Sequence, residues 1–115
     1  MHRDESTVID IAQAAQAIIV FTGGFSRETF LDDLKTRSAV LYQLLVIGEG
    51  VKRLSSDLKK QYPRIPWRNI SGMRDHLIHA YDLVDWDEVW VTSQRDVPAL
   101  LDELYAIAAD HSWEI

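Results

Sequence analysis

The sequence has no cysteine among its 115 residues, which excludes a disulfide framework and a thiolate metal site. It also lacks a long apolar run: stretches such as Ala17–Phe21 are far shorter than the roughly 20 residues that cross a bilayer. The first residues do not show the basic and then apolar pattern of a signal peptide. We therefore expect a cytoplasmic protein that makes no membrane contact.

Composition and length are ordinary for a soluble globular protein. Apolar residues make up 47% of the chain and charged residues 26%, which does not indicate a disordered chain. A chain of 115 residues can bury a modest core without covalent staples. No repeat, low-complexity tract or linker divides it. We expect one domain over residues 1–115.

The net charge of −6 is unevenly distributed. Residues 82–115 contain nine acidic residues against Arg95 alone, whereas residues 52–74 contain seven basic residues against Asp57 alone. The seven are Lys52, Arg53, Lys59, Lys60, Arg64, Arg68 and Arg74. The acidic total argues against a general nucleic-acid binder. The basic band could still hold a phosphate backbone, or it could simply be a solvated helix face.

Apolar residues recur at three- and four-residue steps, which predicts helices. The expected helices span residues 4–21, residues 27–33, residue 34 or 35 to residue 61, a start between 66 and 70 to about 81, and residues 86–110. No convincing alternating strand is present. The predicted fold is an all-α, up-and-down bundle of four or five helices.

Several residues mark where these helices begin, end or pack. Gly23 and Gly24 should end the first helix, and Ser26 should cap the second. Asp85 with Glu88 has the pattern of a capping box, and a kink or break is expected at residues 94–97 because Pro98 follows. Two further glycines, at positions 48 and 50, predict that another backbone packs closely against the long helix. The side chains of Trp67, Trp86, Trp90, Tyr42 and Tyr105 are expected to be buried.

The run from Arg74 to Tyr81 gathers side chains that can act on a phosphodiester. Arg74 has a planar, permanently charged guanidinium that fits phosphate, and His79 can exchange a proton near neutral pH. On a straight helix Arg74 and His79 lie about 140° apart and cannot reach one phosphate together. Asp75 and His79 would share a face, so the Asp75 carboxylate could orient the imidazole.

Other interpretations of this run stay open. His79 taken alone could be a structural helix histidine, and His76 is best explained as a surface residue. A metal site using both histidines would need further ligands, and capping accounts better for Asp85. We therefore predict no metal site. Tyr81 could be a core or interface tyrosine with its hydroxyl satisfied. Glu49, beside the two glycines, is a candidate partner for Arg74 across the bundle.

Four marks in order resemble one known family. They are the IGEGVKRLS stretch at 47–55, YPRIPWR at 62–68, the Arg-x4-His-x-Tyr signature at 74–81 and VDWDEVW at 84–90. This pattern is similar to that of the HepT-like toxins of the HEPN superfamily, and it extends over roughly residues 37–104. A lone Arg-x4-His would be a weak signal, but four marks at matching separations are specific.

The resemblance implies a ribonuclease toxin that needs no metal or other cofactor. In a homodimer with a composite cleft, His79 would act as acid or base toward the ribose 2′-hydroxyl and Arg74 would stabilise phosphate charge. Asp75 would support them. Candidate RNA-binding residues in the basic band are Lys52, Arg53, Arg64 and Arg68.

The same resemblance implies a protein partner. A cognate minimal nucleotidyltransferase would act as antitoxin and attach AMP to Tyr81, which would place added phosphate at the anion site. The alternative function is a catalytically silent nucleotide-binding or adaptor subunit of that nucleotidyltransferase. Retention of both Arg74 and His79 favours the enzyme, whereas the acidic net charge favours the alternative.

Overall fold

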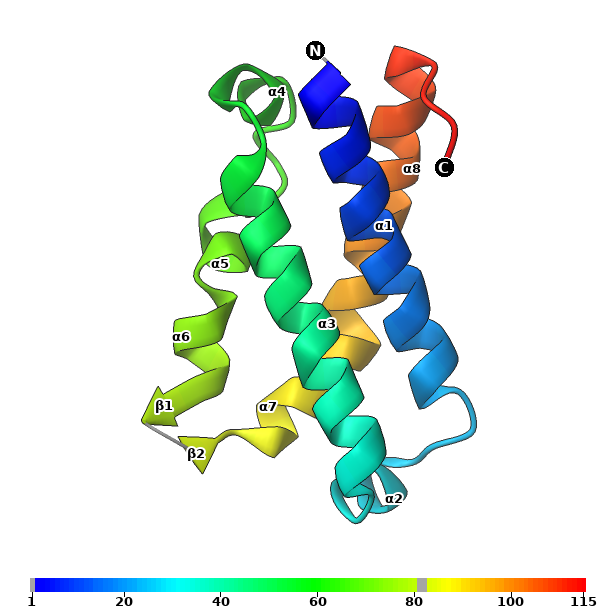
Figure 1. The fold of residues 1–115 in the computed structure, drawn as a ribbon, viewed down its shortest axis with the longest axis vertical. Helices are drawn as coiled ribbons and strands as arrows, with labels where there is room; N and C mark the ends of the chain where they lie inside the picture. The colour runs from blue at the N-terminus through cyan, green and yellow to red at the C-terminus, as the bar shows by residue number, and fades with distance from the viewer. Residues whose placement is uncertain (1, 81–82) are drawn as a thin grey trace.

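Helices run alternately up and down along the long axis of the molecule (Figure 1). The computed structural model describes residues 2–80 and 83–115, with overall dimensions of 41 × 29 × 21 Å. The helices are α1 (His2–Thr22), α2 (Arg27–Leu31), α3 (Leu34–Arg53), α4 (Ser56–Gln61), α5 (Trp67–Ser71), α6 (Met73–Leu77), α7 (Trp86–Val91), the π-helical segment η1 (Thr92–Asp96) and α8 (Val97–His111). The predicted all-α, up-and-down architecture is confirmed.

The core lies where α1 packs against α3 on one side and α8 on the other (Figure 1). Apolar side chains at helical spacing point inward from all three helices, and their burial provides the main stabilisation of the fold. Fully buried members include Val8, Ile11, Ile18, Val40, Leu44, Ile47, Val51, Leu104 and Ile107. The helices α5, α6 and α7 pack against α3 of this central layer.

The turn between α1 and α2 contains the glycine and the serine cap that the sequence predicts. Gly24 has a φ of +82° just after α1, a conformation that glycine adopts without a side-chain clash. Ser26 accepts a hydrogen bond from the Thr29 N–H, and the Thr29 hydroxyl accepts one from the Ser26 N–H, so α2 begins with a reciprocal cap. Helix α2 stops at Leu31, two residues short of the prediction, because Asp33 caps α3 instead.

The prediction of one helix from residue 34 or 35 to 61 is wrong. The chain leaves the helix at Leu54, and Ser55 begins α4 by accepting a hydrogen bond from the Leu58 N–H. The carboxylate of Asp4 in α1 accepts hydrogen bonds from the Ser55 N–H at 2.9 Å and from its hydroxyl at 2.6 Å. This buried tie fixes the corner between α3 and α4.

The predicted signature helix is also wrong in its extent. A bend at Gly72 separates α5 from α6, and α6 ends at Leu77 rather than near residue 81. The chain then forms β1 (Ile78–Ala80), which pairs antiparallel with β2 (Leu83–Val84), so a short strand pair exists where none was expected. The Leu77 carbonyl accepts a hydrogen bond of 2.8 Å from the Asp85 N–H, which replaces the next helical bond.

From Asp85 to the end of α8 the helices lie where they were predicted, but the predicted capping box is only half formed, because the Glu88 side chain contacts His76 instead. Asp85 caps α7 by accepting a hydrogen bond from the Glu88 N–H. The expected interruption before Pro98 is the π-helical segment η1, after which Pro98 occupies the first turn of α8. A proline fits there because first-turn N–H groups have no helical partner.

Glycines 48 and 50 do sit at close contacts, as predicted. A Cβ at Gly48 would lie 3.2 Å from the Ile70 carbonyl oxygen, so the backbone of α5 packs directly on α3. A Cβ at Gly50 would lie only 2.6 Å from Cγ1 of Ile11, so here the neighbour is an α1 side chain instead of a backbone. Both contacts set the spacing between α3 and its neighbours.

The predicted burial of aromatic residues is correct only in part. Trp67, Trp86 and Trp90 are half-buried against the core. Tyr42 on α3 and Tyr105 on α8 are 64% and 41% exposed. The prediction for these two tyrosines is wrong because they lie on outward faces of their helices. Across residues 2–80 and 83–115, no helix combines the length and apolarity needed to cross a membrane.

Candidate functional site

Arg74 projects from α6 beside the middle of α3. It lines a small hollow of about 330 Å³ together with Leu45, Gly48, Glu49 and Ser71. Because Gly48 has no side chain, α5 and α6 approach α3 closely and bring the Arg74 guanidinium near this helix. Arg74 itself is exposed. The hollow therefore presents a permanent cation to solvent, which suits an anionic ligand.

Glu49 shares the hollow with Arg74 but has a different ion-pair partner. Its carboxylate accepts a hydrogen bond of 2.8 Å from Lys52 one turn along α3. This contact with Lys52 lowers the pKa of Glu49, with smaller contributions from Arg53 and Arg74. Glu49 therefore pairs with Lys52 and not with Arg74 as predicted, although Glu49 and Arg74 line the same hollow.

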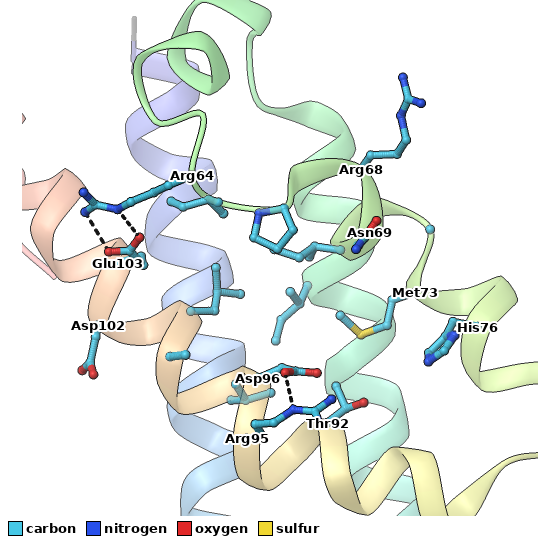
Figure 2. A pocket seen from close by; sticks show the side chains of 18 of the residues that line it. Arg64, Arg68, Asn69, Met73, His76, Thr92, Arg95, Asp96, Asp102 and Glu103 are labelled. Atoms are coloured by element: carbon cyan, nitrogen blue, oxygen red, sulfur yellow. Dashed lines mark hydrogen bonds and ion pairs between the residues drawn. The ribbon is translucent and has the colours of Figure 1, made fainter.

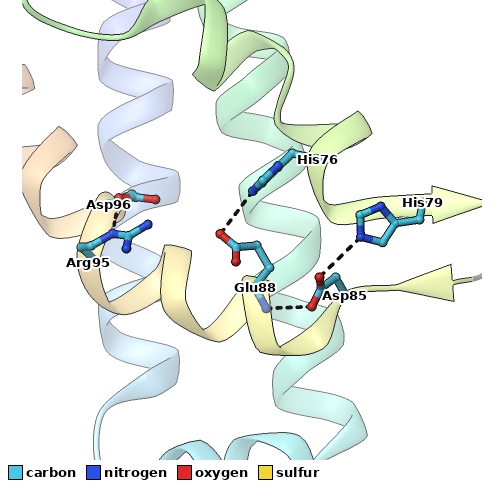
Figure 3. Close-up of polar contacts among 6 residues, drawn as sticks. All are labelled: His76, His79, Asp85, Glu88, Arg95 and Asp96. Atoms are coloured by element: carbon cyan, nitrogen blue, oxygen red, sulfur yellow. Dashed lines mark hydrogen bonds and ion pairs between the residues drawn. The ribbon is translucent and has the colours of Figure 1, made fainter.

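His79 lies on β1, beyond the end of α6, and faces the start of α7 (Figure 3). Its Nε2 is 3.4 Å from Oδ2 of Asp85. The His79 side chain is 57% exposed, so solvent and a ligand can reach it. The shared helical face predicted for Asp75 and His79 does not exist, because α6 ends at Leu77. Asp85 provides the carboxylate beside the imidazole.

The short strand pair explains why Asp85, and not Asp75, lies beside His79. Ile78 pairs with Val84, which brings the chain back past α6 and delivers Asp85 next to His79. Asp85 uses its other carboxylate oxygen to cap α7, accepting the Glu88 N–H at 3.0 Å. That backbone hydrogen bond, followed by the contact with His79, lowers the pKa of Asp85 below its ordinary value of 3.8.

His76 makes a parallel contact with the same turn of α7. Its Nε2 is 3.2 Å from Oε1 of Glu88 (Figure 3). His76 and His79 therefore both face carboxylates at the start of α7 (Figure 3). His76 lies at the edge of a larger groove, whereas His79 lies outside that groove's lining.

The larger groove separates α5 and α6 from η1 and α8 (Figure 2). It has a volume of about 1000 Å³ and an apolar floor that includes Ile47, Met73 and Leu100. Two of the cations that line it are paired with neighbouring acids. Arg64 contacts Glu103 through two hydrogen bonds of 2.7 and 2.9 Å. Arg95 donates a hydrogen bond of 3.0 Å to Asp96 (Figure 2).

The four candidate RNA-binding residues have two kinds of surroundings. Lys52 and Arg64 are held in the surface ion pairs described above. Arg53 and Arg68 are exposed and make no ion pair with any residue in the described ranges. Arg68 points away from the large groove (Figure 2). Exposed ion pairs are weak, so a phosphate could compete for any of these cations.

Asp75 and Tyr81 are the remaining predicted site residues. Asp75 is exposed in the first turn of α6, and no hydrogen bond joins it to His79 among the described residues. Tyr81 lies outside the described residues. Within the two described ranges, no group of three or more His, Cys, Asp or Glu side chains is arranged to hold a metal ion.

Sequence reasoning missed the contacts that Asp85 and Glu88 make with the two histidines. It identified both acids as capping residues, which is correct for Asp85, but it treated the signature as a continuous helix. A signal was available in the sequence: Ile78 and Val84 flank the segment and are β-branched residues, which favour strands.

Comparison with known proteins gives one family for most of the chain. The sequence model described as "Ribonuclease HepT-like" matches residues 11–107, a range that includes Arg74 and His79. No solved structure gives a significant match to the chain.

Individual relatives agree with the family match. "Probable ribonuclease HepT" of Thermococcus cleftensis is 46% identical over 91 residues, which cover 79% of this chain and 83% of the relative. "Putative RNase MJ1216" of Methanocaldococcus jannaschii is 39% identical over 101 residues, covering 88% of this chain and 84% of the relative. "Putative RNase TTE0752" of Caldanaerobacter subterraneus is 36% identical over 90 residues, covering 78% and 80%.

Proposed function

This chain belongs to the HepT-like ribonuclease family, and from that membership we propose that it is an RNA-cleaving toxin of a toxin–antitoxin pair. The observation that carries the proposal is the exposure of Arg74 and His79 within a chain that matches the family across residues 11–107. An exposed imidazole can exchange a proton with the ribose, and an exposed guanidinium can stabilise phosphate charge.

The proposed reaction proceeds through the ribose 2′-hydroxyl without a metal ion. His79 takes the proton from this hydroxyl, and the 2′-oxygen attacks the adjacent phosphorus. The bond from phosphorus to the 5′-oxygen breaks, and the departing oxygen takes up a proton from solvent. Arg74 binds the non-bridging oxygens, where negative charge collects. DNA has no 2′-hydroxyl, so the reaction is restricted to RNA.

We further propose that the working site is shared between two subunits. Within one chain, Arg74 lines the hollow beside α3, whereas His79 faces α7 from the strand beyond α6. No contact joins the two side chains within the described residues. A two-fold dimer could bring Arg74 of one subunit to His79 of the other, since such an interface uses the same patch twice. Asp75 is the proposed support residue on the same helix as Arg74.

The proposed partner is a minimal nucleotidyltransferase that attaches AMP to Tyr81. The sequence places Tyr81 two residues after His79, so the added phosphate would put negative charge close to the catalytic imidazole. That charge would repel RNA and silence the toxin. Mass analysis of the chain after co-expression with the neighbouring nucleotidyltransferase should show the gain of one AMP on Tyr81, and an unmodified Tyr81 would contradict this part.

The test of the enzymatic function compares His79 of the signature with the nearby His76, which is not a signature residue. Cells expressing the wild type should stop growing and contain cut RNA, and His79→Ala should abolish both effects. The purified protein should cut RNA equally well with EDTA present. His76→Ala is the matched control, because His76 is also an exposed histidine beside a carboxylate, and it should remain toxic.

Two outcomes would contradict the ribonuclease. One is undiminished toxicity of His79→Ala. The other is intact RNA in cells that contain the folded wild type, which would favour the silent adaptor subunit instead.

A further inference from the structure

The first turn of α7 holds the carboxylate that faces His79. Asp85 Oδ2 lies 3.4 Å from His79 Nε2, and Asp85 also begins α7. The imidazole is on a strand of only three residues, which by itself fixes a side chain poorly. A hydrogen-bond partner that is itself held in place as a helix cap would fix the orientation of the imidazole.

Asp85 makes hydrogen bonds to the backbone of two helices as well as its contact with His79. Its Oδ1 accepts the Glu88 N–H at 3.0 Å, and its own N–H donates to the Leu77 carbonyl at 2.8 Å. The backbone of Glu88 belongs to α7 and that of Leu77 to α6, so Asp85 is tied to both helices. Its Oδ2 is then directed at His79, the third contact (Figure 3).

The ionisation of Asp85 decides which ring nitrogen carries the hydrogen. The cap hydrogen bond from Glu88 and the contact with His79 lower the pKa of Asp85, so its carboxylate is ionised at neutral pH. An ionised carboxylate only accepts hydrogen bonds. The nitrogen that faces it, Nε2, must therefore carry a hydrogen, and in the neutral ring the lone pair is on Nδ1.

We propose that Asp85 is a positioning residue for His79, holding the imidazole in the Nε2–H form so that Nδ1 takes the proton from the ribose 2′-hydroxyl. This inference rests on the ribonuclease function proposed above and names the nitrogen that performs the proton transfer. When Nδ1 accepts the proton, the positive charge of the imidazolium is stabilised by the Asp85 carboxylate on the opposite side of the ring.

Among the described residues, the charged groups around this pair come from α6 and α7. Asp85 contacts His79 directly, and His76 also stabilises the Asp85 carboxylate through its charge. Glu88 contacts His76 at 3.2 Å and contributes only its backbone N–H to Asp85. The Glu88 side chain therefore provides an internal control: it is a carboxylate on the same turn that serves the other histidine.

The experiment measures the tautomer of His79 by nitrogen NMR in the wild type, Asp85→Asn and Glu88→Gln. Asparagine caps helices about as well as aspartate, so Asp85→Asn should keep α7. It should reduce the Nε2–H population of His79, whereas Glu88→Gln should leave the His79 tautomer unchanged. Asp85→Ser, which can cap but cannot reach the ring, should reproduce the effect of Asp85→Asn.

Kinetics give the second readout. In Asp85→Asn the kcat for RNA cleavage should fall about 10- to 100-fold, with KM nearly unchanged. An unchanged His79 tautomer in both Asp85 variants would overturn the positioning role even if the wild type cuts RNA. A wild type that cuts no RNA but shows the Asp85-dependent tautomer would overturn the ribonuclease and leave the pairing intact.

Discussion

At the scale of single residues, Tyr62 tests the contact between the end of α4 and the end of α8. Its hydroxyl donates a hydrogen bond of 2.9 Å to Asp110 at the end of α8. Burial and this contact with Asp110 raise the pKa of Tyr62 to about 12 from its ordinary value of 10.0. The neutral phenol is therefore favoured in the folded state. Its stabilising contribution is complete below pH 10.0 and is lost as the pH rises through about 12.

We predict that one phenol step near pH 12 disappears in Tyr62→Phe, as measured by the absorbance of tyrosinate during an alkaline titration. Asp110→Asn should keep the phenol but move its step toward lower pH, because the repulsion between phenolate and carboxylate is removed. A wild-type titration that is identical to that of Tyr62→Phe above pH 11 would contradict the contact.

Cations in the basic band differ in whether an acidic side chain already holds them. Arg64 is held by Glu103 in a two-bond pair, but its side chain remains 69% exposed. Exposed pairs of this kind are weak, so RNA phosphate could displace the acid at little cost. Arg74 needs no such exchange, because no ion pair holds it within the described residues. This difference favours Arg74 over Arg64 as the residue that contacts the reacting phosphate.

At the scale of elements, the contact between α1 and α3 has little spare room at Gly50. An alanine there would place its Cβ 2.6 Å from Cγ1 of Ile11, which is fully buried and cannot move away. Overpacking costs about 1–3 kcal/mol, whereas removal of a helical glycine gains about 1 kcal/mol. We predict that Gly50→Ala lowers the free energy of unfolding by up to about 2 kcal/mol, measured by urea denaturation.

A double-mutant cycle provides the control for this prediction. In an Ile11→Ala background the crowded atom is gone, so the same Gly50→Ala change should be neutral or stabilising. A gain in stability from Gly50→Ala in the wild-type background would show that the two helices are further apart than described.

The elements themselves were predictable where a helix depends on its own residues. The cap of α2 by Ser26, the cap of α7 by Asp85 and the break before Pro98 all follow from local chemistry. Two of the boundaries that were wrong depend on distant partners. The corner at Ser55 is held by Asp4, which lies 51 residues away, and α6 ends where its Leu77 carbonyl is taken by the Asp85 N–H.

The candidate site was predictable to the same degree. Residue types identified Arg74 and His79, because their chemistry is visible in the sequence alone. The carboxylate beside His79 was assigned to Asp75 by helical spacing, and that reasoning failed once the helix ended at Leu77. The pairing of Ile78 with Val84 determines which acid reaches the imidazole, and a strand of three residues is too short to give a periodic signal.

At the scale of the whole molecule, the charge is divided between two parts of the chain. Nine of the 18 acidic residues lie at positions 82–115, whereas the basic band at 52–74 includes Arg53 and Arg68 on the exposed surface. RNA would be attracted to the basic part and repelled by the other, so a chain with a net charge of −6 can still orient a polyanion. A dimer that joins two signature regions would bring two basic bands to one cleft.

The central claim is that Arg74 and His79 act together from different subunits, and mixing two inactive variants tests it most directly. Arg74→Ala and His79→Ala should each fail to cut RNA alone. After the two are unfolded together and refolded at equal concentration, half of the dimers contain both variants, and each of those has one intact composite site. We predict that RNA cleavage returns to about a quarter of the wild-type rate. If the mixed dimers form but the mixture stays inactive, the two residues do not share a site across the interface and the account is wrong.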